Sequence, residues 1–186
     1  LVVFSVMIIS TIEALVSAKA VDSLDPLERK TNLNKEIENR GVKAERLILG
    51  KSIPKPEYLA RYRTADLFLD THPYNAGTTA SDALKMGLPM ITYLGKSYQA
   101  RMGASIISAL NLPELITHSQ EEYESLAIEL ATNPDKLKAI KEKLASNLAT
   151  APLYDTKLFA KNIESAYTQM YERHHQGLEP DHIYVE

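Results

Sequence analysis

The sequence predicts an α/β fold in which a parallel sheet carries helices on both faces and is followed by C-terminal helices. Two observations support this prediction. Short apolar runs alternate with single helix patterns up to about residue 117, which is the spacing of βαβ units. The last third of the chain carries only helix signals. We therefore expect a lobe at residues 25–150, a helical extension at 151–186 and an apolar segment of uncertain role at 1–24.

The predicted strands are short runs rich in Leu, Ile, Phe or Tyr that end at turn or helix signals. They lie at residues 47–49, 65–70, 89–93 and 114–116. Single helices separate these strands, and consecutive parallel strands joined in this way bury both faces of their sheet.

The predicted helices begin at capping residues or prolines and end near glycines or turns. Asp25-Pro26 opens the first helix, Ser119-x-x-Glu122 has the capping-box pattern, and Asn133-Pro134 opens another helix. The helices are expected at residues 26–40, 54–62, after the turn at 71–79, and at 98–110, 119–132, 133–147 and 157–175.

The composition excludes several classes of protein. The chain has 186 residues and a net charge of -3, so it lacks the overall positive charge of a protein that binds nucleic acid without sequence preference. With no cysteine, it cannot form disulfides, thiolate zinc sites or iron–sulfur clusters. The histidines lack the spacing of a metal site. We expect a cytoplasmic protein that binds neither nucleic acid nor membrane.

The apolar start of the chain has two interpretations. Residues 1–16 are nearly all apolar and are followed by Ala18-Lys19-Ala20, which is similar to a signal-peptidase site. Glu13 interrupts the apolar run and no basic residues precede it, so we favour a buried strand or helix of a larger domain. The run at 1–12 is too short to cross a bilayer.

The turn after the predicted strand at 65–70 is the candidate binding site. Gly77, Thr78 and Thr79 lie where this strand gives way to a helix, so backbone N–H groups and two hydroxyls suit a phosphate group. Asp82 follows one turn later on the face of Thr78 and suits a ribose diol. An ordinary helix cap is the alternative interpretation of the same residues.

Lys55 and Tyr58 form a second candidate pair. They lie one turn apart on the predicted helix at 54–62, where a lysine could bind a phosphate or ribose and a tyrosine could stack on a base. Two solvated side chains on a surface helix are the alternative.

A long ordered set of motifs resembles the C-terminal catalytic region of the O-linked N-acetylglucosamine transferase/SPINDLY family. The segments are DLFLDTHPYNAGTTASDALKMGLPMITYLGKSYQARMGASIISALNLPELI, then EEYESLAIELATNP, APLYDT and GLEPDHI. The resemblance covers about residues 45–183 and is strongest to bacterial members with tetratricopeptide repeats. It implies the Rossmann-like C-terminal lobe of a GT-B glycosyltransferase, which holds a nucleotide sugar, usually UDP-N-acetylglucosamine (UDP-GlcNAc), and transfers the sugar to Ser/Thr of proteins.

The resemblance also implies roles for individual residues. Thr78 and Thr79 match the pair that contacts the diphosphate, and Asp82 matches the carboxylate that binds the ribose. Lys55 and Arg61 match basic residues of the nucleoside pocket. Tyr58 stands where many relatives have a histidine stacked on the uracil, and an aromatic ring preserves stacking.

One departure from the family pattern concerns the nucleotide. Gly77 stands where many relatives have a histidine, so a side-chain donor to the diphosphate is missing. The SPINDLY branch, which uses GDP-fucose, resembles this chain in having a glycine followed by threonines. The neighbouring NAxTTASDAL pattern favours the N-acetylglucosamine branch, so UDP is the preferred interpretation and GDP the alternative.

The resemblance places the remaining machinery upstream of this chain. Relatives carry tetratricopeptide repeats, the first lobe, the acceptor groove and the proposed general base there. We therefore expect no catalytic residue in this chain, no activity from it alone, and no cofactor or metal. The helix at 157–175 should expose the apolar side chains of Phe159, Ile163, Tyr167 and Met170, which resemble those of a helix that returns toward the first lobe. The alternative is a non-catalytic remnant that binds a nucleotide or a partner.

Overall fold

The computed structural model describes residues 52–185. Three parallel strands form the sheet in the order β1-β2-β3: β1 (Phe68–Leu69), β2 (Met90–Tyr93) and β3 (Ile116–Thr117). Phe68 pairs with Met90, and Thr92 pairs with Ile116. The predicted helix at 26–40, the strand at 47–49 and the segment at 1–24 lie outside the described residues.

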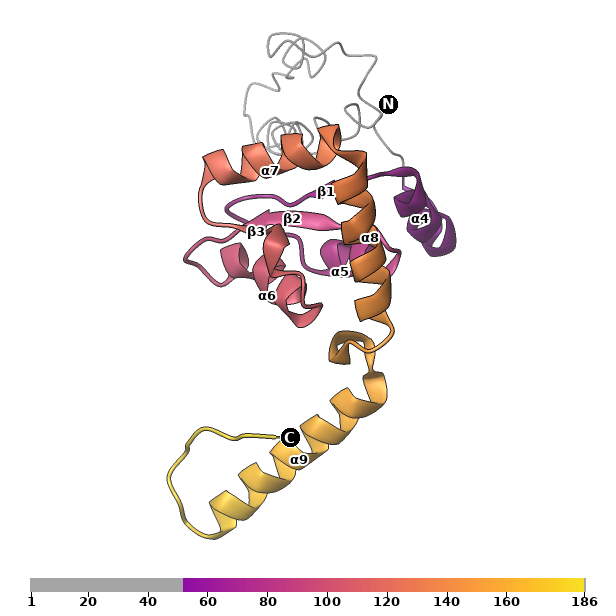
Figure 1. Ribbon diagram of the computed structural model, residues 1–186. Helices are drawn as coiled ribbons and strands as arrows, with labels where there is room; N and C mark the ends of the chain where they lie inside the picture. Colours follow the sequence, from indigo (N-terminus) through magenta and orange to yellow (C-terminus); the bar gives the residue numbers. More distant parts are fainter. Residues whose placement is uncertain (1–51, 186) are drawn as a thin grey trace, which may run out of the picture.

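Helices cover both faces of the sheet, as predicted. α5 (Thr78–Lys85) connects β1 to β2, and α6 (Met102–Ala109) connects β2 to β3 on the same face, whereas α7 (Gln120–Thr132) covers the opposite face (Figure 1). α4 (Lys55–Arg61) precedes β1, and α8 (Pro134–Leu148) follows α7. The 3-10 turns lie at Tyr62–Thr64, Gln99–Arg101, Pro113–Leu115 and Pro152–Tyr154.

Three predicted boundaries are wrong. The strand expected at 65–70 is confined to Phe68–Leu69. The strand expected at 114–116 begins only at Ile116, because Pro113 starts a 3-10 turn in which Leu115 packs into the core. The helix expected over 98–110 opens with a 3-10 turn, and its α-helical part is confined to α6. These differences are local and leave the order of elements as predicted.

The core lies between the sheet and its flanking helices. Leu84 of α5, Ile107 of α6 and Leu130 of α7 are fully buried against it, together with Met90 and Ile91 of the central strand. The strands are therefore covered on both sides, which explains why consecutive residues of β1 and β2 are buried rather than alternate ones.

The predicted helix caps at Ser119 and Asn133 are present. Ser119 Oγ accepts the N–H of Glu122 at 3.1 Å, and Asn133 Oδ1 accepts the N–H of Lys136 at 3.1 Å. Each of these bonds satisfies an N–H group that a helix start otherwise leaves without a partner.

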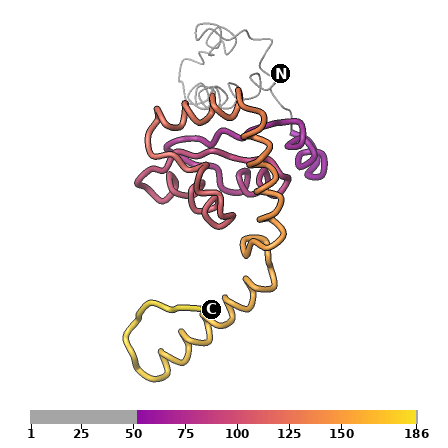
Figure 2. Tube along the Cα trace, in the orientation of Figure 1, coloured from indigo at the N-terminus to yellow at the C-terminus, as the bar shows by residue number. Residues whose placement is uncertain are grey.

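The last helix, α9 (Thr156–His175), extends away from the sheet and contains no buried residue (Figure 2). Phe159, Tyr167 and Met170 are 65%, 63% and 49% exposed, and Ile163 is 37% exposed. This confirms the predicted apolar surface. Among residues 52–185, no helix combines the length and apolar character needed to span a membrane.

Candidate functional site

A buried carboxylate fixes the loop that leads from β1 to α5. Asp70 Oδ1 accepts the N–H groups of Thr71 and Ala76 at 2.9 and 2.8 Å, and Thr92 Oγ1 on the neighbouring strand donates to Oδ2 at 2.6 Å. The carboxylate therefore ties both ends of the loop to the central strand. Because α5 begins two residues beyond Ala76, the same bonds position the start of α5.

Asn75 and Gly103 connect this loop to α6. The amide of Asn75 donates to the carbonyl of Thr71 at 2.6 Å, and its oxygen accepts the N–H of Gly103 at 3.3 Å. A Cβ atom on Gly103 would lie 2.2 Å from Asp70 Oδ2 and 2.5 Å from Thr92 Oγ1. Only glycine allows this close approach. Sequence reasoning missed these residues, although a polar residue directly after a buried strand was the available signal.

The start of α5 is open to a ligand. Gly77 precedes the helix, and among residues 52–185 no side chain accepts a hydrogen bond there from the first-turn N–H groups. The side chains of Thr78 and Thr79 are exposed beside these groups. Gly77 occupies the N-cap position, as the alternative interpretation of an ordinary helix cap expects, and the N–H groups and hydroxyls can also serve an anion.

The structure brings Lys55, Tyr58 and Asp82 together beside the start of α5. The Lys55 ammonium forms an ion pair with Asp82 Oδ2 and lies 4.9 Å from the centre of the Tyr58 ring. The Asp82 side chain is only 18% exposed, whereas that of Lys55 is 58% exposed. The predicted pair Lys55 and Tyr58 thus forms one cluster with the predicted carboxylate Asp82 from a distant part of the sequence, and the cluster offers a cation, an anion and an aromatic face.

Tyr62 supports this cluster and was missed from the sequence. Its hydroxyl forms a hydrogen bond with that of Tyr58 and donates to the carbonyl of Thr79 at 3.4 Å. The two rings pack edge to face with their centres 5.2 Å apart. Burial, followed by the hydrogen bond with Tyr58, raises the pKa of Tyr62 well above its ordinary value, so the hydroxyl stays protonated. Tyr62 thereby links α4 to the first turn of α5.

Arg61 lies at the last residue of α4, with its side chain exposed, three residues beyond Tyr58. No group of three or more His, Asp or Glu residues within the described part of the chain has the arrangement of a metal site. The cluster combines a lysine, a carboxylate, two tyrosines and a helix start, and these groups suit a nucleotide.

Comparison with known proteins identifies the family. The model of glycosyl transferase family 41 matches residues 24–163, which is most of the chain. The chain belongs to glycosyl transferase family 41. The predicted resemblance is thus confirmed, and the family model also extends over residues whose structure is outside the described range.

Individual relatives of family 41 agree with this assignment. A probable UDP-N-acetylglucosamine–peptide N-acetylglucosaminyltransferase SEC of Arabidopsis thaliana is 37% identical over 78% of this chain. A UDP-N-acetylglucosamine–peptide N-acetylglucosaminyltransferase of Caenorhabditis elegans is 32% identical over 85% of it. The matched regions are 15% and 14% of those relatives' lengths, so this chain corresponds to a small part of each.

The fold prediction is confirmed by a solved structure. The chain matches the K341M mutant of a Thermobaculum terrenum O-GlcNAc transferase with a TM-score of 0.70 and 34% identity, over 80% of this chain and 28% of that one. The three-stranded parallel sheet with helices on both faces accordingly has the architecture expected of the C-terminal lobe of a GT-B glycosyltransferase.

Proposed function

We propose that this chain is the donor-binding, C-terminal half of a protein O-glycosyltransferase that transfers N-acetylglucosamine from UDP-GlcNAc to Ser/Thr of proteins in the cytoplasm. The observation that carries the proposal is the cluster of Lys55, Tyr58 and Asp82 beside the start of α5. Family membership and the printed activities of the relatives support it.

In the proposed complex, each part of the nucleotide meets complementary chemistry. The diphosphate binds the first-turn N–H groups of α5 and the hydroxyls of Thr78 and Thr79, with Gly77 allowing close approach. The ribose hydroxyls donate to Asp82. The base stacks on Tyr58, while Lys55 and Arg61 supply positive charge around the nucleoside and phosphates.

The role of this lobe in the reaction follows from where charge develops. When the acceptor hydroxyl attacks the anomeric carbon, its proton passes to the general base expected upstream, the bond from that carbon to the diphosphate oxygen breaks, and negative charge grows on the leaving group. The start of α5, with Thr78 and Thr79, stabilises that charge because its donors are fixed before the reaction begins. No metal or cofactor takes part in this proposal.

The proposed enzyme needs an upstream lobe and a protein acceptor. A reaction in a cleft between two lobes depends on the orientation of both substrates, so the chain by itself is expected to bind the donor without transferring the sugar. The upstream tetratricopeptide repeats and the first lobe are partners in this proposal.

GDP-fucose is the second candidate donor. Gly77 favours it, because the absence of a side chain at this position resembles the SPINDLY branch. Calorimetric titration with UDP and GDP in metal-free buffer separates the two donors. UDP binding supports the first proposal, and a preference for GDP replaces it with the fucosyl alternative.

A variant tests the site itself. Thr79→Ala should weaken UDP binding about fivefold, since it removes one hydroxyl donor to a charged group. Thr168→Ala on α9 is the matched control and should leave the affinity unchanged. If the chain is folded but binds neither nucleotide, the proposed donor site is wrong and the remnant interpretation gains support.

A further inference from the structure

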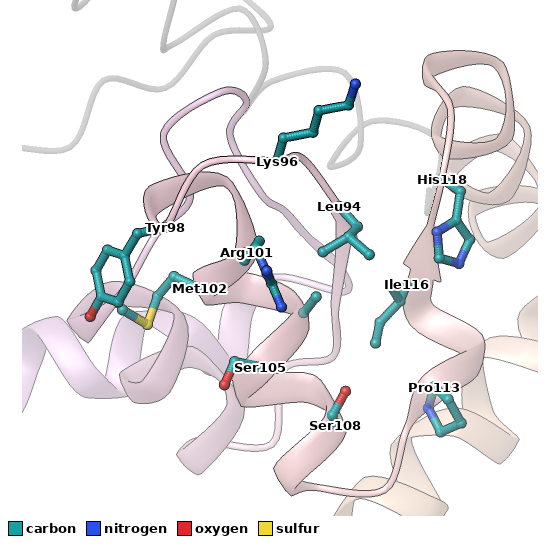
Figure 3. A pocket seen from close by; sticks show the side chains of 11 residues that line it. Leu94, Lys96, Tyr98, Arg101, Met102, Ser105, Ser108, Pro113, Ile116 and His118 are labelled. Carbon is teal, nitrogen blue, oxygen red and sulfur yellow. The ribbon is translucent and has the colours of Figure 1, made fainter. Parts of the chain in front are cut away.

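An open cavity of about 820 Å³ lies at the carboxyl ends of β2 and β3 (Figure 3). Leu94 follows β2 and His118 follows β3, while one side of α6 forms the facing wall. Loops at this edge of an open α/β sheet are where ligands bind. A volume of this size admits a ligand of several residues rather than a single small ion.

The cavity is lined by basic residues without acidic ones. Arg101 reaches toward its centre, His118 stands on the opposite wall and Lys96 lies at the rim (Figure 3). Within residues 52–185, no Asp or Glu lines the cavity, and neither Lys96 nor Arg101 forms an ion pair. The carboxylate of Glu122 accepts the backbone N–H of His118 at 2.8 Å. This positive lining contrasts with the net charge of -3 of the whole chain.

The remaining walls combine apolar and hydroxyl groups. Leu94, Met102 and Ile116 are partly exposed on them, and Ser105 and Ser108 lie on the exposed side of α6. An extended peptide is complementary to these walls. The apolar parts of its side chains can pack on the aliphatic side chains of the cavity, while its backbone carbonyls and carboxylates accept hydrogen bonds. In particular, the carboxylate of an acidic side chain can accept two parallel hydrogen bonds from the Arg101 guanidinium.

The cavity adjoins the donor site. Met102 lines it, and a Cβ atom placed on Gly77 at the start of α5 would lie 3.9 Å from Met102 Cγ. The proposed diphosphate position and the cavity are thus neighbours on the same edge of the sheet. A peptide in the cavity would pass beside the donor without occupying its place.

We propose that this cavity binds an acidic segment of the acceptor protein that continues past the donor from the acceptor groove expected upstream. This inference rests on the proposed function, because it needs a donor at the start of α5. Arg101 is the main contact for the acidic side chain, and Lys96 adds long-range attraction at the rim.

The test uses the full chain and two synthetic peptides. One has a central serine flanked by glutamates, and the other has glutamines in place of the glutamates. Calorimetry is carried out with each peptide, with and without saturating UDP. The acidic peptide should bind about fivefold more tightly than the neutral one at low salt, and UDP should not compete with it.

Matched variants locate the binding surface. Arg101→Gln should reduce the affinity for the acidic peptide about fivefold and remove the difference between the two peptides. Arg63→Gln removes the same charge from an exposed position outside the cavity and should change nothing. Circular dichroism checks that both variants fold.

Each other outcome overturns one proposal. Equal binding of the two peptides, no peptide binding, or an unchanged affinity in Arg101→Gln refutes the acceptor site. Competition by UDP also refutes it, because the cavity would then belong to the donor site. If peptide discrimination persists but UDP fails to bind, the proposed donor function is refuted instead.

Discussion

Asp82→Asn is the most direct test of the nucleotide site. The carboxylate is 18% exposed, pairs with Lys55 and lies one turn into α5, where the proposed ribose hydroxyls would donate to it. A hydrogen bond to a charged acceptor contributes roughly 1.5–3 kcal/mol, and asparagine retains a neutral acceptor of similar shape. We therefore expect a loss of about 1–2 kcal/mol, which is roughly a 5- to 30-fold weaker affinity for UDP.

The effect of Asp82→Asn on stability should be small. Lys55 is 58% exposed and can be hydrated when its partner loses its charge, so the free energy of unfolding should fall by less than about 1 kcal/mol. Calorimetric titration with UDP measures the affinity, and urea denaturation measures the stability. Asp135→Asn on the exposed first turn of α8 is the control with the same chemical change. An affinity within about twofold of the unaltered chain would refute the assigned role of Asp82.

Three further predictions follow from individual contacts. Gly103→Ala should destabilise the fold by about 2–4 kcal/mol in urea denaturation, because its Cβ would collide with Asp70 and Thr92, whereas Ser108→Ala on the same helix should not. The folded-state pKa of Tyr62 is raised above 10.0, so its contribution to stability is complete below that pH and is lost as the pH rises further. Denaturation at several pH values should therefore show a shallower alkaline decline for Tyr62→Phe, and equal slopes would contradict this. Gly77→His restores a side-chain donor and should strengthen UDP binding about threefold by calorimetry, and weaker binding would show that the imidazole does not reach the diphosphate.

Much of the fold was predictable because its signals are local. The apolar runs around Phe68 and Met90 and the caps at Ser119 and Asn133 each depend on residues close in sequence. The motif order around Thr78 also indicated the family, which the match to residues 24–163 confirms. Boundaries were less certain, because at Pro113 burial of Leu115 favours a 3-10 turn over an earlier strand start.

The candidate site was predictable only in part. The sequence nominated Lys55, Tyr58 and Asp82 from local spacing and family resemblance, but spacing could not show that Lys55 and Asp82 form an ion pair across 27 positions. It gave no reason to select Tyr62, whose role depends on reaching Thr79 of another helix.

The sequence by itself determined the fold class and the family, because helix, strand and motif signals depend on residues that are close together in the sequence. Only the tertiary structure decided how distant groups meet. Asp70, Asn75 and Gly103 interlock because the loop between β1 and α5 meets the start of α6 at one edge of the sheet. The basic cavity around Arg101 likewise exists because the parallel strands β2 and β3 bring the segments that follow them side by side.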